Sequence, residues 1–431
     1  MTISSIAEAK RSGGGCADRP GVGPLVAPDS ESLTPLRQRV FDRIRAAGAM
    51  PRVRIARELG VSPGSVTPLV AELIEAGLVE EIAARADAEA GRGRPAVMLG
   101  VRRDAGVVAG MKLSDAEHTV VLTDFAGGLI ASEGAAPRRG DRSLDGLLDA
   151  AEALLARVCE RAGVDRRDVR AVGIGVPGFV EAASGRVLWS PILRARDVDL
   201  AAVAAARLGL PAHVDNDANL VALAELWFGA GRALSDFAVV TIEHGVGLGL
   251  VINHRLYRGA RGVGAELGHT KVALDGALCR CGQRGCLEAY VADYALAREA
   301  ATALDGMAAD GEPAGVLLER LFERAKAGDA AARSIFRRAG RYLAVGLANV
   351  VNLFDPALVI LSGERMRYDY LYSDEALAEL SRLIVAADRP PPPIEVHAWG
   401  DLMWAHGAAA LALSAVTEAM LGAVRESRDA G

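Results

Sequence analysis

The chain has 431 residues, which is too long for one ordinary hydrophobic core and predicts two or three domains. The formal net charge is −6, but residues 31–103 hold twelve Arg against nine Asp and Glu, so a basic front precedes an acidic body. No apolar run is long enough to span a bilayer, and the N-terminus lacks the apolar centre of a secretory signal. These features lead us to expect a cytoplasmic protein, neither membrane-spanning nor secreted, with a polyanionic partner for its front.

The chain opens with a stretch that predicts no fixed structure. Residues 1–30 are rich in Gly, Pro and Ser and show no hydrophobic period, which is typical of a disordered tail. The pattern then changes, because Leu36, Val40 and Ile44 recur at the spacing of one helix face. We therefore predict a first helix that ends near Gly48.

Residues 31–100 as a whole predict a winged helix-turn-helix domain. A helix from Arg52 to Leu59 and a second helix from Pro63 to Ala76 flank a turn whose glycine permits a sharp crossing. A serine before the second helix can cap it, so the small and polar residues of its first turns face outward and can approach a major groove. The predicted DNA-binding residues of this helix are Ser62, Gly64, Ser65, Thr67 and Pro68.

A strand pair after Gly77 is predicted to form the wing. The sequence between or after the strands contains Arg92 and Arg94 in an extended, cationic run, which suits contact with phosphates or with a narrow minor groove. The alternative interpretation of the front is a helical bundle with an arginine-rich linker. Helices, turn, wing and local charge agree on DNA binding, which we therefore favour.

From Val107 onward the chain alternates apolar strands, glycine turns and long Ala- and Leu-rich helices. Strands and helices in this order predict an α/β body, large enough for two lobes. We expect a smaller lobe over 101–217 together with 401–431, and a larger lobe over 218–400.

Three of the five cysteines lie within eight residues, in the sequence CRCGQRGC. Together with His269, the thiols Cys279, Cys281 and Cys286 offer four ligands, and the two glycines let the backbone fold around one ion. We predict a closed, structural zinc site. An iron–sulfur cluster and three buried, unligated cysteines are the alternatives.

The sequence GAELGHT followed by CRCGQRGCLEAY resembles the signature of the ROK family, which groups sugar-responsive repressors with sugar kinases. Further stretches that resemble the family are VGIGVPGFVEAASGRVLWSP, HVDNDANLVALAELWFG and GLANVVNLFDPALVILSGE. The resemblance covers essentially everything from Thr34 on. It implies a two-lobed, actin-like ATPase body with a sugar cleft between the lobes, to which the repressor branch adds an N-terminal winged helix.

The resemblance also implies which side chains contact a sugar, and these chemistries suit vicinal hydroxyls. The implied sugar-binding residues are Asn216, Asp217, Glu266, His269 and Glu288. His269 would bind zinc through one ring nitrogen and turn the other toward the sugar. For Asp217 a role as helix N-cap is the alternative.

Two functions of different class are open at this point. The family's kinases begin the body with a strand that ends in D-x-G-G-T, whose glycines let backbone N–H groups approach the phosphates. The equivalent stretch here is AGMKLSDAEHT, which puts Lys112, Ser114, Asp115 and Ala116 at those positions. We therefore predict a regulator, more specifically a repressor, without enzymatic activity. The alternative is a sugar kinase with an appended DNA-binding domain and Asp217 as its base.

One position departs from the family within the implied sugar site. Ile192 follows Ser190 and Pro191, where family kinases usually carry an asparagine. We therefore expect a less hydroxylated, substituted or phosphorylated sugar as effector, or a chain that no longer senses sugar. The expected partners are operator DNA, this effector and a second copy of the chain in a homodimer or homotetramer, with no membrane.

Overall fold

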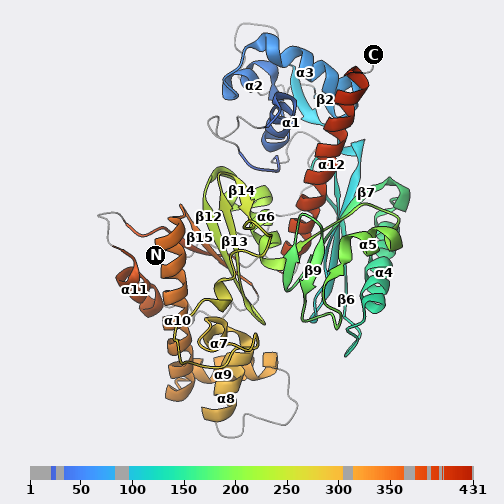
Figure 1. Ribbon diagram of the computed structural model, residues 1–431. Helices are drawn as coiled ribbons and strands as arrows, with labels where there is room; N and C mark the ends of the chain where they lie inside the picture. The colour runs from blue at the N-terminus through green and yellow to red at the C-terminus, as the bar shows by residue number, and fades with distance from the viewer. Residues whose placement is uncertain are drawn as a thin grey trace. The chain divides into compact units, whose positions relative to one another are not determined.

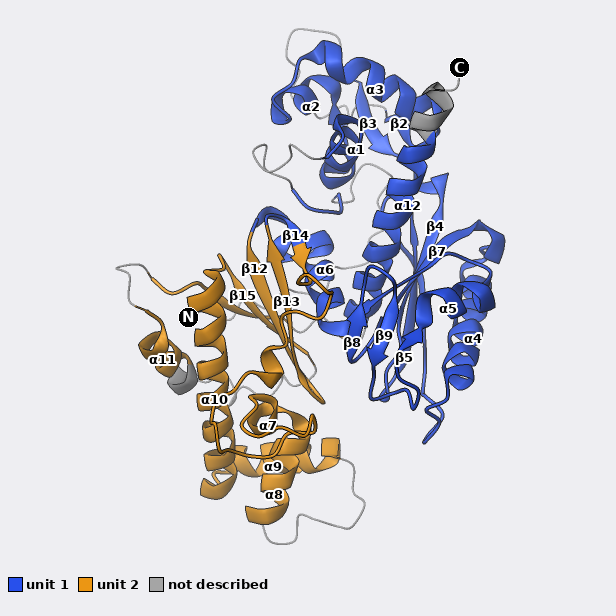
Figure 2. Ribbon diagram, in the orientation of Figure 1, with its two compact units in different colours: residues 1–235, 253–255, 402–431 blue, residues 236–252, 256–401 orange. Residues whose placement is uncertain are grey.

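The computed structural model describes residues 21–25, 34–82, 97–303, 314–363, 374–385, 390–397, 400 and 402–429. These residues form two compact units, which Figure 2 shows in different colours. Unit 1 comprises Met1–Ser235, Asn253–Arg255 and Leu402–Gly431. Unit 2 comprises Asp236–Ile252 and Leu256–Asp401.

The first domain of unit 1 is the predicted winged helix. Its sheet has the order β1-β3-β2, with both pairs antiparallel, and three helices pack against it (Figure 1). The elements are α1 (Leu36–Ala47), β1 (Met50–Pro51), α2 (Arg52–Glu58), α3 (Pro63–Glu75), β2 (Val79–Ile82) and β3 (Met98–Val101). The predicted helices and strand pair are thus confirmed to within a residue or two at their ends.

Local sequence explains why these helices meet. The apolar face of α2 and that of α3 are buried against each other, through Ile55 and Ala56 on one side and Val66 and Val70 on the other. Ser62 caps α3 by accepting the backbone N–H of Ser65 at 3.1 Å, as the sequence predicted.

A five-stranded sheet with the order β11-β7-β4-β5-β6 forms the rest of unit 1. Helices α4 (Leu144–Ala162) and α5 (Leu200–Leu208) pack on one face, while α6 (Asp217–Phe228) and α12 (Met403–Asp429) lie on the other (Figure 1). The strands are β4 (Val107–Lys112), β5 (His118–Asp124), β6 (Leu129–Ala135), β7 (Val169–Val176) and β11 (Ala212–Asn216). A small antiparallel sheet of β8 (Phe179–Glu181), β9 (Arg186–Trp189) and β10 (Val198–Asp199) follows β7.

Helix α12 lies directly on the backbone of this sheet. Gly110 of β4 and Gly173 of β7 face it, and a Cβ at either position would overlap the carbonyl oxygens of Ala405 and Ala408. Gly407 of α12 in turn leaves room for the backbone of α6. The absence of side chains at these glycines therefore sets how closely both helices approach the sheet and each other.

Unit 2 has its own five-stranded sheet, with the order β14-β13-β12-β15-β16. Strands β12, β15 and β16 are parallel, and β13 is antiparallel to β12. The strands are β12 (Phe237–Ile242), β13 (Val246–Ile252), β14 (Arg255–Tyr257), β15 (Val359–Ser362) and β16 (Ile394–His397), of which Arg255 is grouped with unit 1. The helices are α7 (Glu288–Val291), α8 (Asp293–Ala303), α9 (Ala314–Lys326), α10 (Ala330–Phe354) and α11 (Asp374–Leu383).

The units divide later in the chain than the sequence predicted. The change lies between Ser235 and Asp236, whereas we expected it after Asp217. The reason is that α6 packs against α12, so the whole helix belongs to unit 1. The chain returns to unit 1 at Leu402, one residue from the predicted return.

Part of the predicted disordered tail is ordered. Residues 21–25 lie against unit 1, where the N–H of Val22 donates to the carbonyl of Arg45 at 3.1 Å and the N–H of Gly23 donates to that of Trp227 at 2.8 Å. The prediction was wrong for this segment because backbone hydrogen bonds to distant residues fix it, and such partners leave no periodic pattern. The other predicted tail residues, 1–20 and 26–30, lie outside the described residues.

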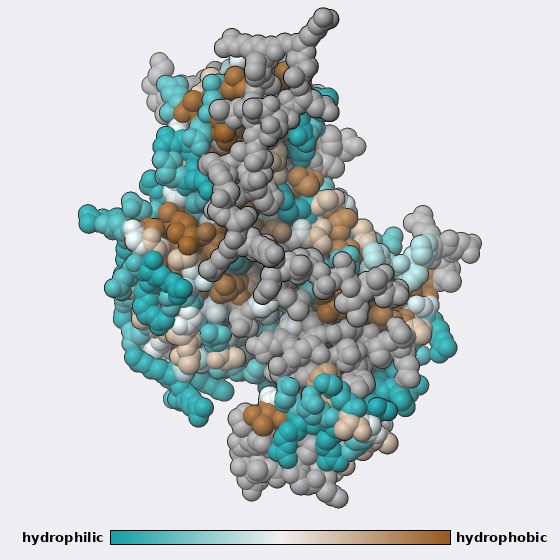
Figure 3. Space-filling view, turned by 180° about the vertical axis from the view of Figure 1, so that it is seen from behind, coloured by the Kyte–Doolittle hydropathy of each residue, from teal (hydrophilic) through white to brown (hydrophobic). Residues whose placement is uncertain are grey.

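The surface of the described residues is mixed in hydropathy. On the face that Figure 3 shows, hydrophobic residues form separate patches among hydrophilic ones. Among the described residues, the helices are all too short or too polar to cross a membrane.

Candidate functional site

The four predicted metal ligands come together in unit 2. One ligand atom from each of His269, Cys279, Cys281 and Cys286 lies within 4.8 Å of all the others. The Sγ atoms of Cys281 and Cys286 are 3.7 Å apart, and Cys279 Sγ lies 3.8 Å from His269 Nδ1. This set of one imidazole and three thiols could hold a metal ion.

Two tight turns present the cysteines. Leu278 and Arg284 form an antiparallel bridge that closes a small loop, in which Gly282 has a φ of +88°. Gly285 has a φ of +75°, and a Cβ there would overlap the carbonyl of Ala273. Both glycines are therefore required by backbone geometry, which is the role that their spacing predicted.

The donor set and its distances suit zinc. A tetrahedral ion with Zn–S bonds of about 2.3 Å holds its thiolates roughly 3.8 Å apart, close to the spacing found here. Lys271 donates from Nζ to Cys286 Sγ at 3.0 Å, so a cation lies beside a sulfur that a metal would hold as thiolate. Sequence reasoning missed this lysine, because it lies outside the motif.

The predicted sugar-binding residues of unit 2 belong to the same cluster or lie beside it. His269 ends the short helix η5 (Leu267–His269), and its backbone N–H donates to the backbone carbonyl of Glu266 at 3.1 Å. Glu266 is exposed, whereas Glu288 is half-buried and its Oε1 lies 3.7 Å from Cys279 Sγ. Metal ligands and predicted sugar ligands are thus parts of one structure. Tyr294, which the sequence did not single out, donates to both Cys279 Sγ and Glu288 Oε1.

The other two predicted sugar-binding residues belong to unit 1, at the start of α6. Asn216 is the N-cap: its Oδ1 accepts the N–H of Ala218 at 2.8 Å, and its Nδ2 donates to the carbonyl of Gly178 at 2.6 Å. Asp217 is the first residue of the helix. The N-cap role that was the alternative for Asp217 therefore belongs to Asn216. Burial raises the pKa of Asp217 to about 6, while the Lys112 ammonium lowers it.

The turn after β4, which stands where the family's kinases have their phosphate loop, is held by hydrogen bonds from its backbone to its own side chains. Two of its backbone N–H groups are used within the turn: Ser114 N–H donates to His118 Nδ1 at 3.2 Å, and Glu117 N–H donates to Ser114 Oγ at 3.2 Å. Lys112, at the end of β4, is buried with its ammonium 3.6 Å from the centroid of the Trp404 ring. These groups are therefore engaged where a kinase needs donors aimed at phosphate.

The second glycine-rich loop, between β12 and β13, is also engaged. The N–H of Val246 lies 3.4 Å from Glu288 Oε2, and a Cβ at Gly245 would come within 2.9 Å of the same oxygen. The loop thus supports a predicted sugar ligand through backbone packing.

A cavity of about 340 Å³ in unit 1 borders the turn at Ser114 and Asp115. It is lined by Ile192, Asp115, His118 and a segment with three arginines, among them Arg142. His118 is buried, which lowers its pKa, and its Nδ1 accepts the N–H of Ser114. The neutral ring therefore carries its proton on Nε2, as a donor for the cavity.

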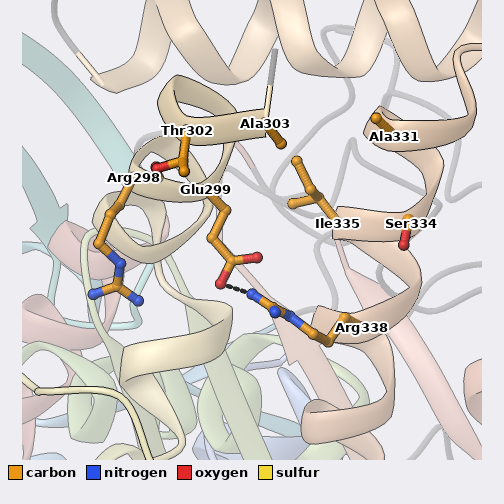
Figure 4. Close-up of a pocket in the computed structure, with 8 residues that line it drawn as sticks. All are labelled: Arg298, Glu299, Thr302, Ala303, Ala331, Ser334, Ile335 and Arg338. Carbon is orange, nitrogen blue, oxygen red and sulfur yellow. Dashed lines mark hydrogen bonds and ion pairs between the residues drawn. The ribbon is translucent and has the colours of Figure 1, made fainter.

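A second hollow, of about 490 Å³, lies in unit 2 between α8 and α10. An ion pair between Glu299 and Arg338 joins the two helices across it, as Figure 4 shows. The residues that line it are Arg298, Glu299, Thr302, Ala303, Ala331, Ser334, Ile335 and Arg338, none of which is a predicted site residue.

The predicted DNA-binding residues of α3 lie on one exposed surface. Ser62, Gly64, Ser65, Thr67 and Pro68 are all exposed, while Val66 between them is buried. The hydroxyl of Thr67 donates to the backbone carbonyl of Pro63 at 2.9 Å, one helical turn earlier. Arg92 and Arg94 of the predicted wing lie outside the described residues.

Relatives of the chain include proteins named as transcriptional regulators. A putative xylose repressor of Caldicellulosiruptor sp. (strain Rt8B.4) is 31% identical over 342 residues, which are 77% of this chain and 83% of that protein. The DNA-binding transcriptional dual regulator NagC of Escherichia coli (strain K12) is 28% identical over 328 residues, or 75% of this chain and 79% of that one.

Solved structures give the same picture. A ROK family transcriptional regulator, described as a homolog of the E. coli MLC protein, has a TM-score of 0.75 and 25% identity and covers 91% of this chain and 98% of its own. A ROK family glucokinase from Streptomyces griseus, in complex with glucose and AMPPNP, has a TM-score of 0.61 and 33% identity and covers 71% of this chain and 99% of its own. These likenesses confirm the predicted fold class, a winged helix followed by an actin-like α/β body.

The ROK family profile matches residues 119–415, well over half of the sequence. This match includes the metal-ligand cluster and the start of α6. The chain therefore belongs to the ROK family.

Proposed function

We propose that this protein is a sugar-responsive, DNA-binding transcriptional regulator, and more specifically a repressor. The observation that carries the proposal is that a winged helix is joined to a ROK body in whose phosphate-loop turn the N–H groups of Ser114 and Glu117 donate to side chains of the turn itself. Relatives named as xylose and N-acetylglucosamine repressors support it. The protein would bind operator DNA and respond to a sugar without transforming it.

Lys112 explains how the body can keep its sugar side chains without kinase chemistry. Its ammonium lies where the family's kinases carry an aspartate, and it acts electrostatically on Asp217, which would otherwise be the base. A fixed cation at this position disfavours a second one, so a magnesium ion carried by ATP would be repelled. Asp217 then serves as an acceptor for a sugar hydroxyl.

DNA binding would use the exposed start of α3 in the major groove and the wing along the backbone. Ser65 and Thr67 would approach base edges, whereas Arg92 and Arg94 would contact phosphates or the minor groove. Two copies of the chain, as a homodimer or within a homotetramer, would place two such helices on half-sites related by a two-fold axis.

The cavity beside Ile192 supports a substituted sugar as effector. An isoleucine offers no hydrogen bond to a hydroxyl, but the cavity that it lines adds about 340 Å³ next to Asp115 and His118. The Nε2–H of His118 and the guanidinium of Arg142 can both donate. We infer that the effector carries a substituent with hydrogen-bond acceptors, such as an acetamido or a phosphate group.

Removing Glu266 tests the function as a whole. We expect Glu266→Ala to bind DNA like the wild type but to lose the response to effector, with sugar affinity reduced roughly ten- to a hundred-fold because a carboxylate partner of the hydroxyls is gone. Thermal shift with D-xylose, D-glucose, N-acetyl-D-glucosamine and their phosphates identifies the effector. Mobility shift on a DNA site selected from a random-sequence pool then measures the response. Asp275→Ala, an exposed carboxylate of the same unit, is the control. An unchanged response in Glu266→Ala would place sugar sensing elsewhere.

Zinc is the metal that we propose for the cluster, and its site is testable by itself. The purified protein should contain one zinc ion per chain, and Cys281→Ser should lose it, because three ligands hold a structural ion far less tightly than four. Metal analysis measures the content. Cys159→Ser, at a buried cysteine of unit 1, should keep the full zinc content. A wild-type protein without zinc after mild purification would contradict the assignment.

The absence of kinase activity is a separate expectation. With ATP and Mg²⁺, the protein should form no sugar phosphate from any sugar that it binds, because both loops are engaged within the protein. Product formation followed by mass spectrometry is the measurement. Turnover at the rate of an ordinary kinase, on the order of 1 per second or more, would favour the kinase alternative instead.

The environment of Asp217 predicts a pH dependence. Its carboxyl pKa is raised from its ordinary value to about 6, so the native state holds the proton longer than the unfolded state does. Preferential proton binding stabilises the native state fully below the ordinary pKa near 4. This contribution to the free energy of unfolding is lost as pH rises through about 6. Asp217→Asn should therefore gain about 2 kcal/mol relative to wild type between about pH 4.5 and pH 7.5. Urea unfolding measures the difference, and Asp145→Asn on α4 should follow the wild type. A constant difference across this range would contradict the assignment.

A further inference from the structure

A buried arginine connects the winged helix to the body of unit 1. Arg45 lies in the last turn of α1 and is only 3% exposed. Its Nη2 donates to Thr417 Oγ1 of α12 at 2.7 Å, and this hydroxyl in turn donates to the carbonyl of Leu413. The DNA-binding domain and the C-terminal helix of the body are thus joined by a charged hydrogen bond inside the protein.

Aromatic rings enclose the same guanidinium. Its carbon lies 4.5 Å from the ring centroid of Phe41 in α1, 5.1 Å from that of Phe125 after β5, and 5.5 Å from that of Trp227 in α6. The rings come from the winged helix, the sheet and α6. Attraction between a cation and ring faces is strongest where water is excluded, as it is here.

The enclosure leaves the charge incompletely satisfied. Among the described residues, Arg45 Nε is buried without a hydrogen-bond partner. Burial lowers the pKa of Arg45 to about 10, and Asp42 on the same helix opposes that effect. The interaction energy of a buried cation that is held by a hydrogen bond and three rings changes when any of these partners moves slightly.

One of those partners is a direct extension of the proposed effector site. Helix α6 begins at Asp217 and continues without a break to Phe228, so Trp227 lies ten residues farther along one rigid rod of about 15 Å. The carbonyl of Trp227 also accepts the N–H of Gly23, which ties the ordered N-terminal segment to the same end of the helix. A shift of α6 at its first residue would therefore move the Trp227 ring relative to the Arg45 guanidinium.

A second arginine fastens the same junction. Arg232, just after α6, donates to the carbonyl of Gly23 at 3.0 Å and to that of Ala46 in the winged helix at 2.7 Å. These bonds reach backbone atoms only and can follow small movements. They hold the domains together, whereas the ring and hydroxyl contacts of Arg45 depend on the relative positions of α6 and α12.

We propose that Arg45 is the positioning residue through which effector binding alters the winged helix. An effector held by Asp217 shifts α6 relative to α12, the ring of Trp227 and the hydroxyl of Thr417 no longer fit the guanidinium equally, and α1 adopts a new position. The inference rests on the function proposed above, because it requires that an effector bind beside Asp217. A purely structural Arg45 would affect stability but not the response to effector.

Arg45→Met in the full chain tests the proposal. Methionine fills a similar volume, and replacing a buried charge by an apolar side chain is often neutral for stability, so the variant should fold. Sugar affinity should stay within about twofold of wild type, while the effector-induced change in operator affinity falls to about twofold or less. Thermal shift measures the first with whichever of D-xylose, D-glucose, N-acetyl-D-glucosamine and their phosphates stabilises the wild type. Mobility shift measures the second.

Two further variants keep the test decisive. Thr417→Val removes the hydroxyl that Arg45 contacts while keeping its shape, and it should also weaken the response without altering sugar affinity. Arg43→Met, on the same helix, removes an ion pair with Glu58 inside the winged helix and should leave the response intact. If Arg45→Met does not fold, the pair Thr417→Val and Arg43→Met decides the question.

The outcomes separate this inference from the proposed function. A wild-type response in Arg45→Met, or in Thr417→Val if the first variant is unfolded, would overturn the role of Arg45 and leave the regulator intact. Loss of sugar binding in Arg45→Met would equally overturn it, since the residue would then act on the site itself. A wild-type protein that binds none of the sugars would overturn both proposals.

Discussion

The contact between α12 and the backbone of the unit 1 sheet is the constraint on which the rest of this structure depends. It exists because Gly110 and Gly173 present no side chain to the helix. Along its length α12 then meets three groups in turn: Trp404 contacts Lys112, Gly407 contacts α6, and Thr417 contacts Arg45. One helix thus links the replaced phosphate loop, the start of the proposed effector site and the winged helix.

The same scaffold shows how a kinase-like body can serve a regulator. The start of α6 and the metal-ligand cluster position the predicted sugar ligands, and these positions depend on backbone geometry and on the cysteine loop. Phosphate binding depends on donors that point at solvent, and a few side chains suffice to engage them. Ser114 and His118 do so at one loop, and Glu288 does so at the other.

The metal cluster adds a second kind of coupling, within unit 2. Its loops hold the histidine next to Glu266 and one of the cysteines next to Glu288, so an ion bound there would also fix the proposed sugar ligands. Tyr294 adds a donor to the same group. A short segment without regular secondary structure can thereby present polar groups in fixed positions.

Two parts of this protein were determined by its sequence alone, because the interactions that create them are local. The helices of the winged domain follow from apolar spacing and from the Ser62 cap, and the metal cluster follows from four ligands within eighteen residues, His269 to Cys286. Only the tertiary structure decided which distant segments meet. Arg45 and Thr417 are 372 positions apart, and the order of residues 21–25, the place of α6 in unit 1 and the contact of Lys112 with Trp404 likewise join distant segments. An arginine on a helix is ordinarily solvated, and no local pattern distinguishes one that the fold encloses in aromatic rings.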